Sequence, residues 1–145
     1  MKLLTVGLVL ISIVGCKSFD EYSTKIKLEG GETPTFVLSG SGLLSDFIVY
    51  GPRQRPGEGG RAFTVWEIQP VKGTSEGELL KKIGSIKYGV VPKGYKQIYP
   101  EDGSMPPPVV PGVRYVYWAQ TVNAPHAREE FELIGGKATV IPGNR

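Results

Sequence analysis

The sequence predicts an all-β fold, a single antiparallel β-sandwich, and three observations support this prediction. The chain contains 20 glycines and 12 prolines in 145 residues, a composition that favours turns over helices. Apolar residues recur with a period of two in short runs between these turns, which is typical of β-strands. Only residues 74–84 carry a helical pattern. Many closely spaced short strands indicate a sandwich, and a small antiparallel barrel is the alternative.

The first predicted strands lie between residues 33 and 51. The run TFVLSG leads through a Gly-Ser-Gly turn into LLSDFIVYG, where Phe47 and Val49 alternate with Ile48 and Tyr50. Both faces of this second run are apolar, so we expect a well-covered strand. A shorter strand is expected at Lys25–Leu28, in an otherwise polar and charged segment.

A loop rich in glycine and proline, GPRQRPGEGGR, separates these strands from AFTVWEIQP. In the latter run, Trp66 and Ile68 share one face. Pro70 ends the strand because proline has no N–H to donate to a neighbouring strand.

The middle of the chain is less regular. Residues 74–84 predict a helix of one or two turns, with Ser75 and Glu78 at capping-box spacing. Two strands are expected in SIKYGVVPKGYKQIYP, joined by a turn that suits a positive φ at Gly94. Residues 101–112 form a long, proline-rich connection.

The C-terminal part has the clearest pattern. VRYVYWAQTV alternates large side chains on both faces and therefore suits a central strand. In REEFELI, Phe131 and Leu133 share a face, and Gly135-Gly136 suits a primed hairpin turn into KATVI. We expect seven to nine strands in all.

One segment of the domain resembles a known family. Val109, Pro111, Gly112 and Tyr115 match the tyrosine corner of fibronectin type III domains, where the tyrosine hydroxyl bonds back to the connecting backbone. By the same resemblance, Trp66 corresponds to the core tryptophan of an early strand. The resemblance implies a fibronectin type III-like or immunoglobulin-like sandwich, with Tyr115 and Trp66 in structural roles.

The N-terminus has a separate signature. Lys2 precedes an uncharged run, Leu3–Val14, that is too short to span a membrane and has the length of a signal-peptide core. Ile13-Val14-Gly15-Cys16 resembles the bacterial lipobox, which implies cleavage before Cys16 and acylation of that residue. Two or three acyl chains make a durable anchor. In lipoproteins of enteric bacteria, a residue other than Asp after the cysteine, here Lys17, implies the outer membrane.

Three segments follow from these patterns: a cleaved signal peptide over residues 1–15, a lipidated tether over 16–32, and the sandwich over 33–145. Removing residues 1–15 takes away Lys2 and leaves 16 basic against 14 acidic residues. This weak positive charge argues against a nucleic-acid partner. One cysteine and one histidine exclude a disulfide, a Cys-based zinc site and the usual serine triad, so we expect no metal and no cofactor.

The candidate ligand-binding residues are Arg53, Arg55 and Arg61, because three guanidinium groups in one loop can bind carboxylate or phosphate. The partner would be an envelope protein or an anionic group of the cell wall or lipid, and a solvated loop is the simpler interpretation. Weaker candidates also have simpler explanations. These are His126 with Glu129 and Glu130 as metal ligands, the Glu101–Ser104 turn, the prolines at 106–108, and Tyr95 with Tyr99 as a stacking strip.

We therefore expect a lipid-anchored protein of the bacterial cell envelope that acts as a non-catalytic binding or structural module. One alternative is an inhibitor or immunity protein directed against an envelope-targeted enzyme or toxin. Another is a cell-wall hydrolase, whose two carboxylates would come from distant parts of the chain.

Overall fold

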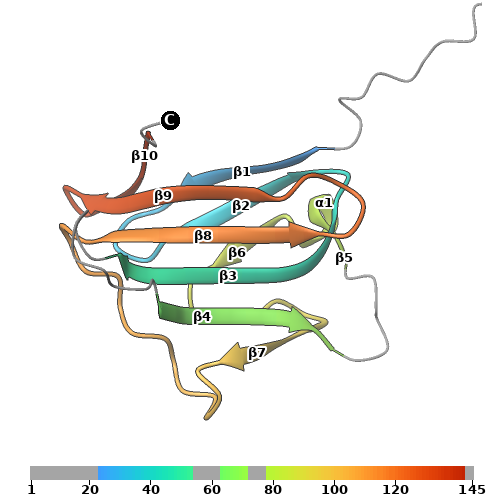
Figure 1. Cartoon of the computed structure of the whole chain (residues 1–145), viewed down its shortest axis with the longest axis horizontal. Coiled ribbons are helices and arrows are strands. Elements are labelled where there is room, and N and C mark those ends of the chain that lie inside the picture. Colours follow the sequence, from blue (N-terminus) through green and yellow to red (C-terminus); the bar gives the residue numbers. More distant parts are fainter. Residues whose placement is uncertain (1–22, 54–62, 72–77, 143–145) are drawn as a thin grey trace, which may run out of the picture.

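Two antiparallel sheets pack face to face in this chain, so the predicted β-sandwich is confirmed and the barrel alternative is wrong. The computed structural model describes residues 23–53, 63–71 and 78–142, with the side chains of 52 and 53 excepted. Figure 1 shows the larger sheet in front of the smaller one. In the described part of the chain, no helix is long and apolar enough to cross a membrane.

The smaller sheet has three strands in the order β1-β2-β6, which are Thr24–Glu29, Thr35–Gly40 and Ser85–Lys87. The larger sheet has the order β10-β9-β8-β3-β4-β7. Its strands are β3 (Leu43–Arg53), β4 (Phe63–Pro70), β7 (Tyr95–Tyr99), β8 (Arg114–Thr121), β9 (Ala127–Ile134) and β10 (Lys137–Ile141). The two-residue strand β5 (Glu78–Leu79) pairs with the start of β3 and leads into α1 (Leu80–Ile83).

Aromatic rings from both sheets form the centre of the core. Phe36 of β2 meets three rings of the larger sheet edge-on, with centroid distances of 4.8 Å to Phe47, 5.2 Å to Tyr117 and 5.9 Å to Phe131. Trp66 extends this cluster along β4 and is fully buried. Such edge-to-face pairs contribute about 0.5–1.5 kcal/mol each beyond the burial of their area. The alternating pattern of the sequence therefore places its largest rings between the sheets.

The tyrosine corner predicted at Tyr115 is present. The buried Tyr115 hydroxyl accepts a hydrogen bond of 3.0 Å from the backbone N–H of Val110, in the connection that precedes β8. Trp66 occupies the core as expected. β8 is a central strand between β9 and β3, as its pattern indicated. Positive φ angles at Gly94, Gly135 and Gly136 confirm the two predicted turns.

Two boundaries differ from the prediction. The strand expected at Lys25–Leu28 is present as β1, and it pairs along its whole length with β2. The sandwich therefore includes residues before 33, where we expected the domain to begin.

The helix is a single turn whose N-cap residue is Leu79, and no side chain caps it. The predicted capping box is wrong because Glu78 and Leu79 pair with β3, and Leu80 N–H donates to the carbonyl of Gly42.

Candidate functional site

The loop that carries Arg53, Arg55 and Arg61, here called the arginine loop, lies almost entirely outside the described residues. Arg53 is the last residue of β3, and its backbone lies opposite Arg114 of β8. The side chain of Arg53 lies outside the described residues, as do Arg55, Arg61 and the predicted lipidation site Cys16. Anion binding by the arginines therefore remains a prediction from the sequence.

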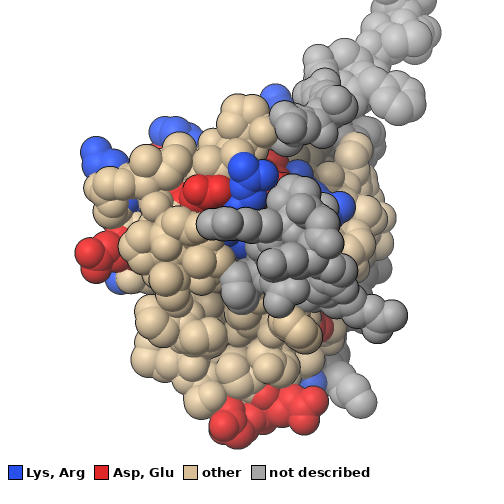
Figure 2. Space-filling view, turned by 60° about the vertical axis from the view of Figure 1, so that its left-hand side comes forward, with Lys and Arg blue, Asp and Glu red and all other residues tan. Residues whose placement is uncertain are grey.

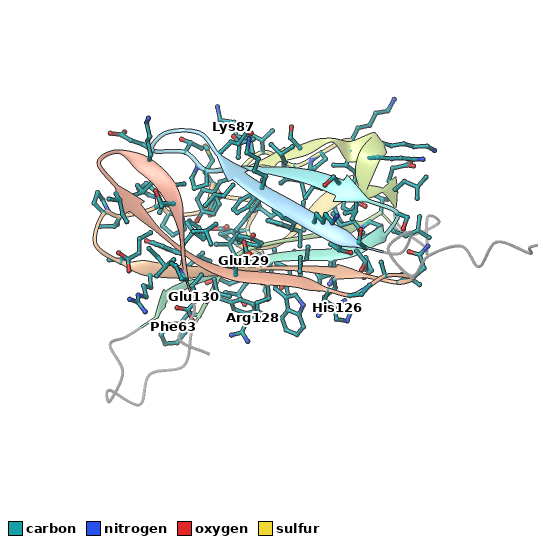
Figure 3. All side chains as sticks on the ribbon, turned by 90° about the horizontal axis from the view of Figure 1, so that it is seen from above. Phe63, Lys87, His126, Arg128, Glu129 and Glu130 are labelled. Carbon is teal, nitrogen blue, oxygen red and sulfur yellow. The ribbon has the colours of Figure 1, made fainter. Side chains whose placement is uncertain are left out.

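His126, Glu129 and Glu130 do not form a metal site. His126 Nδ1 accepts a hydrogen bond of 3.2 Å from the backbone N–H of Thr121. Glu129 points between the sheets, whereas His126 and Glu130 lie on the opposite side of the larger sheet (Figure 3). On the side that faces the smaller sheet, Glu129 accepts a hydrogen bond from the Tyr117 hydroxyl. In the described ranges, no group of three acidic, His or Cys side chains is placed to hold a metal ion.

The Glu101–Ser104 segment is an Asp-Gly turn. Asp102 Oδ1 accepts a hydrogen bond of 3.0 Å from the backbone N–H of Ser104, and hydrogen bonding from the Ser104 side chain first and from this N–H second lowers the pKa of Asp102. The side-chain amide of Gln97 donates to the carbonyls of Pro100 and Ser104. The turn is thus held by local hydrogen bonds and needs no bound cation.

The predicted stacking strip on β7 is wrong. Tyr95 is only 7% exposed, and its hydroxyl donates to the carbonyl of Leu44 at 2.8 Å. Of the two tyrosines, only Tyr99 is exposed.

The prolines at 106–108 belong to a connection that packs on the sandwich, where the Tyr88 hydroxyl donates a hydrogen bond to the carbonyl of Pro107.

The structure assembles a different group, on the outer face of the larger sheet, which is the side turned away from the smaller sheet. Strand pairing places five residues opposite one another across β9, β8, β3, β4 and β7: Arg128, Trp118, Ile48, Glu67 and Tyr99. In the neighbouring positions, Asp46 lies opposite Gln120, and Gln69 lies opposite Lys96. The alternation of strands turns these side chains away from the core.

Asp46 is the most unusual member of this group. Its Oδ1 atom is buried and has no hydrogen-bond partner among the described residues. Burial first and the nearby charge of Glu67 second raise the pKa of Asp46, hydrogen bonding from Gln69 and the Phe47 backbone acts in the opposite direction, and the resulting pKa is about 6. The Gln69 amide also donates to Glu67 Oε1 at 3.0 Å. Gln69 therefore links the environments of the two carboxyl groups.

Irregular strand pairing accompanies both carboxyl groups. The register of β3 with β8 shifts between Leu44 and Asp46. The register of β4 with β7 shifts between Glu67 and Ile68. Such bulges reorient side chains and are over-represented beside functional sites.

Tyr50 and Arg128 belong to the same electrostatic neighbourhood. Burial raises the pKa of Tyr50, the charges of Asp46 and Glu67 add to this effect, and the charge of Arg128 opposes it. We name Asp46, Tyr50, Glu67, Gln69, Trp118, Gln120 and Arg128 the outer-face cluster. Its members come from four strands.

No local sequence pattern predicts this cluster as a whole. One signal was available, because Asp46 is the only charged residue in the run LLSDFIVYG. A charged residue inside a covered strand requires an explanation. The partner residues of Asp46, however, depend on strand pairing that no local pattern specifies. Comparison of the chain with protein-family models, with curated proteins and with solved structures finds no match.

Proposed function

We propose that this chain is a lipid-anchored protein of the bacterial cell envelope, and that its β-sandwich is a non-catalytic binding or structural module. The observation that carries this proposal is the run Ile13-Val14-Gly15-Cys16 directly after a short apolar segment. Lys17 favours the outer membrane as the place of the anchor. The acylated Cys16 would be the contact with the membrane.

The start of the sandwich fits an anchored chain. β1 begins at Thr24, only eight residues after Cys16, so the connecting segment can span at most about 29 Å. This distance is roughly half of the 50 Å that a sixteen-residue tether reaches. The sandwich would therefore stay close to the membrane surface.

A binding role is supported by the mixture of side chains on the outer face of the larger sheet. The other face of that sheet packs on the core, whereas the outer-face cluster combines aromatic, amide and charged side chains on four strands. Rigid elements hold such groups more precisely than loops do. The arginine loop would supply a second contact, to an acidic protein or an anionic group.

The cell-wall hydrolase is the second candidate, and one observation favours it. Asp46 has its pKa raised to about 6, with Glu67 close enough to contribute to the shift. Two carboxyl groups in unequal environments are the usual requirement for glycoside hydrolysis. The hydrolase would release soluble fragments from purified cell-wall saccharide, and Asp46→Asn and Glu67→Gln would each abolish the release. A binding module would release none.

The third candidate, an inhibitor or immunity protein, differs from a structural module in the partner that it binds. If the chain is an inhibitor, crosslinking in the intact envelope and capture of the tagged chain should recover one enzyme or toxin. The matched control replaces Arg53, Arg55 and Arg61 by alanine, and of these only Arg53, at the end of β3, belongs to the described sandwich. A structural module would instead recover abundant envelope components.

Membrane fractionation of Cys16→Ser tests the anchor. The unmodified chain should be found with the membranes and should incorporate labelled palmitate. The serine variant should lose the label and leave the acylated membrane fraction. If the variant retained both properties, the anchor would not be at Cys16.

A further inference from the structure

The end of the sandwich at which β1 begins, here called the tether end, is formed by several segments of the chain. It consists of residues 23–25, 41–43, 71, 78–84, 92–94 and 121–126. Hydrogen bonds join these segments: the backbone N–H of Ser41 donates to the carbonyl of Ser23 at 3.1 Å, and that of Leu80 donates to the carbonyl of Gly42 at 3.0 Å. Figure 1 shows the start of β1, α1 and the connection between β8 and β9 at this end.

Lysines outnumber carboxyl groups at the tether end. Its charged residues, all of them exposed, are Lys25, Glu78, Lys81, Lys82 and Lys93. His126 is also exposed and is neutral at pH 7. The carboxylate of Glu78 pairs with Lys82 at 3.0 Å. Four lysines against one glutamate give this end an excess of three positive charges.

The neighbouring charges leave most of this excess in place. Residues 17–22 carry one lysine and two acidic residues, and residues 72–77 carry one of each, so the excess becomes two. Further along the larger sheet, the basic residues Lys96 and Arg128 are balanced by the acidic residues Asp46 and Glu67. The opposite end of the sandwich is mixed, because the charged side chains there are Glu29, Glu32, Lys87, Glu101, Asp102, Arg114, Glu130, Glu132 and Lys137.

Two exposed valines accompany the lysines at the tether end. Val71 is 46% exposed, and its backbone N–H donates to the carbonyl of Gly94, next to Lys93. Val122 is 60% exposed, and its backbone N–H donates to the carbonyl of Leu43. At the boundary between lipid headgroups and acyl chains, such apolar side chains leave water while lysines beside them meet anionic headgroups.

The short connecting segment brings the tether end to the membrane. Thr24 follows Cys16 by eight residues, which span at most about 29 Å. A short linker keeps the local concentration of the membrane surface high, so a weak attraction is enough to orient the sandwich. Charges interact over about 10 Å at 0.1 M salt, and within that range each lysine favours the docked state about fivefold.

We propose that the tether end docks on an anionic phospholipid surface, with its exposed lysines against the headgroups and Val122 at the boundary with the acyl chains. This inference rests on the proposed function, because the acylated Cys16 holds the chain at that surface. An acidic soluble protein would meet the same lysines, but only the bilayer is kept next to them by the connecting segment. Docking would direct the proline-rich connection, residues 101–112, away from the membrane.

Fluorescence quenching in vesicles tests this proposal on the full chain, purified from membranes with its acyl chains. Acylation blocks the thiol of Cys16, the only native cysteine, so Val122→Cys carries a single site for a fluorophore. The vesicles contain a headgroup-labelled quencher in phosphatidylcholine alone, or in equal parts of phosphatidylcholine and phosphatidylglycerol. We expect at least about threefold stronger quenching in the anionic vesicles, and a loss of this difference at about 0.5 M salt. A fluorophore on Met105→Cys, 78% exposed at the opposite end, should show little quenching in either.

A set of charge variants tests the role of the lysines. Replacing Lys25, Lys81 and Lys93 by glutamine should lower the ratio of docked to undocked chain by about tenfold or more. The matched control replaces three exposed lysines outside the tether end by glutamine: Lys27, Lys87 and Lys137. It removes the same charge and should leave the quenching at residue 122 nearly unchanged.

The inference would be overturned by equal quenching in neutral and anionic vesicles, by equal quenching at residues 122 and 105, or by equal losses in the two triple variants. Thermal unfolding of each variant checks that the fold is retained. Flotation of the vesicles separates this inference from the proposed function. A chain that floats with the vesicles but shows no quenching at residue 122 contradicts docking alone, whereas a chain isolated without acyl chains contradicts the anchor.

Discussion

The hydroxyl group of Tyr115 accepts a hydrogen bond of 3.0 Å from the backbone N–H of Val110, and this contact joins the proline-rich connection to a central strand. In Figure 2 the lower left part of this end of the sandwich is mostly uncharged, with acidic side chains at its lower tip. Residues 103–113 contain no charged side chain. No ion pair made by these side chains can therefore hold the connection to the sandwich, and the contact with Tyr115 is one of its few polar attachments.

Replacing Tyr115 by phenylalanine should reduce the free energy of unfolding by about 1–2 kcal/mol, because the partly buried N–H of Val110 loses its acceptor. Urea unfolding measures this loss. Tyr99→Phe is the matched control, since Tyr99 is exposed, and it should change the stability little. If Tyr115→Phe and the unmodified chain had the same free energy of unfolding, the hydrogen bond between Tyr115 and Val110 would not stabilise this fold.

The ring of Tyr115 lies so close to the backbone of residue 51 that only glycine fits there. A Cβ atom at residue 51 would lie 2.1 Å from Cδ1 of Tyr115, which is far below van der Waals contact. Gly51→Ala should therefore destabilise the fold by about 1–3 kcal/mol, the usual cost of overpacking. Gly31→Ala is the control, because its added Cβ would meet only the carbonyl oxygen of Gly136 at an ordinary 3.5 Å. Similar midpoints of urea unfolding for the two variants would contradict this packing.

The stability of the chain should depend on the protonation of Asp46. Its pKa is raised from 3.8 to about 6, so the folded state favours the neutral acid. This contribution is present below pH 4 and is lost as the pH rises to 6 and above. Glu67 and Gln69 on β4, Gln120 on β8, Tyr50 on β3 and Arg128 on β9 face the same region.

Asp46→Asn should remove this dependence while keeping the shape of the side chain. The free energy of unfolding of the variant, minus that of the unmodified chain, should be larger at pH 7.5 than at pH 4.5. Urea unfolding at both pH values measures this difference. Glu101→Gln is the control at an exposed turn. A difference between Asp46→Asn and the unmodified chain that does not change with pH would show that Asp46 titrates normally.

Local sequence patterns were sufficient for the strands that carry large alternating side chains. Tyr115 of β8 is buried and makes the contact that the tyrosine-corner resemblance implied, and Phe131 of β9 lies in the core because its alternation with Glu130 and Glu132 leaves only one apolar face. The turn at Gly135 was predictable from its two adjacent glycines, which adopt positive φ. These features depend on neighbours in the chain.

The remaining features depend on pairing between distant segments. Charged residues such as Lys25 and Lys27 gave the β1 region the composition of a tether, whereas Ile26 and Leu28 pack against the core. The pairing of Glu78 with β3 replaced the expected capping box. Asp46 and Glu67 are twenty-one residues apart in the sequence, and only the register of β3 and β4 brings them together. A pattern within one strand does not specify that register.

We propose that the chain is anchored through Cys16, and the mass of the mature N-terminus can decide this. Mass spectrometry of the chain isolated from bacterial membranes should find Cys16 as the first residue, carrying diacylglycerol on Sγ and an acyl chain on its amino group. Residues 1–15 should be absent. A peptide that continues through Gly15 into an unmodified Cys16 would contradict the claim.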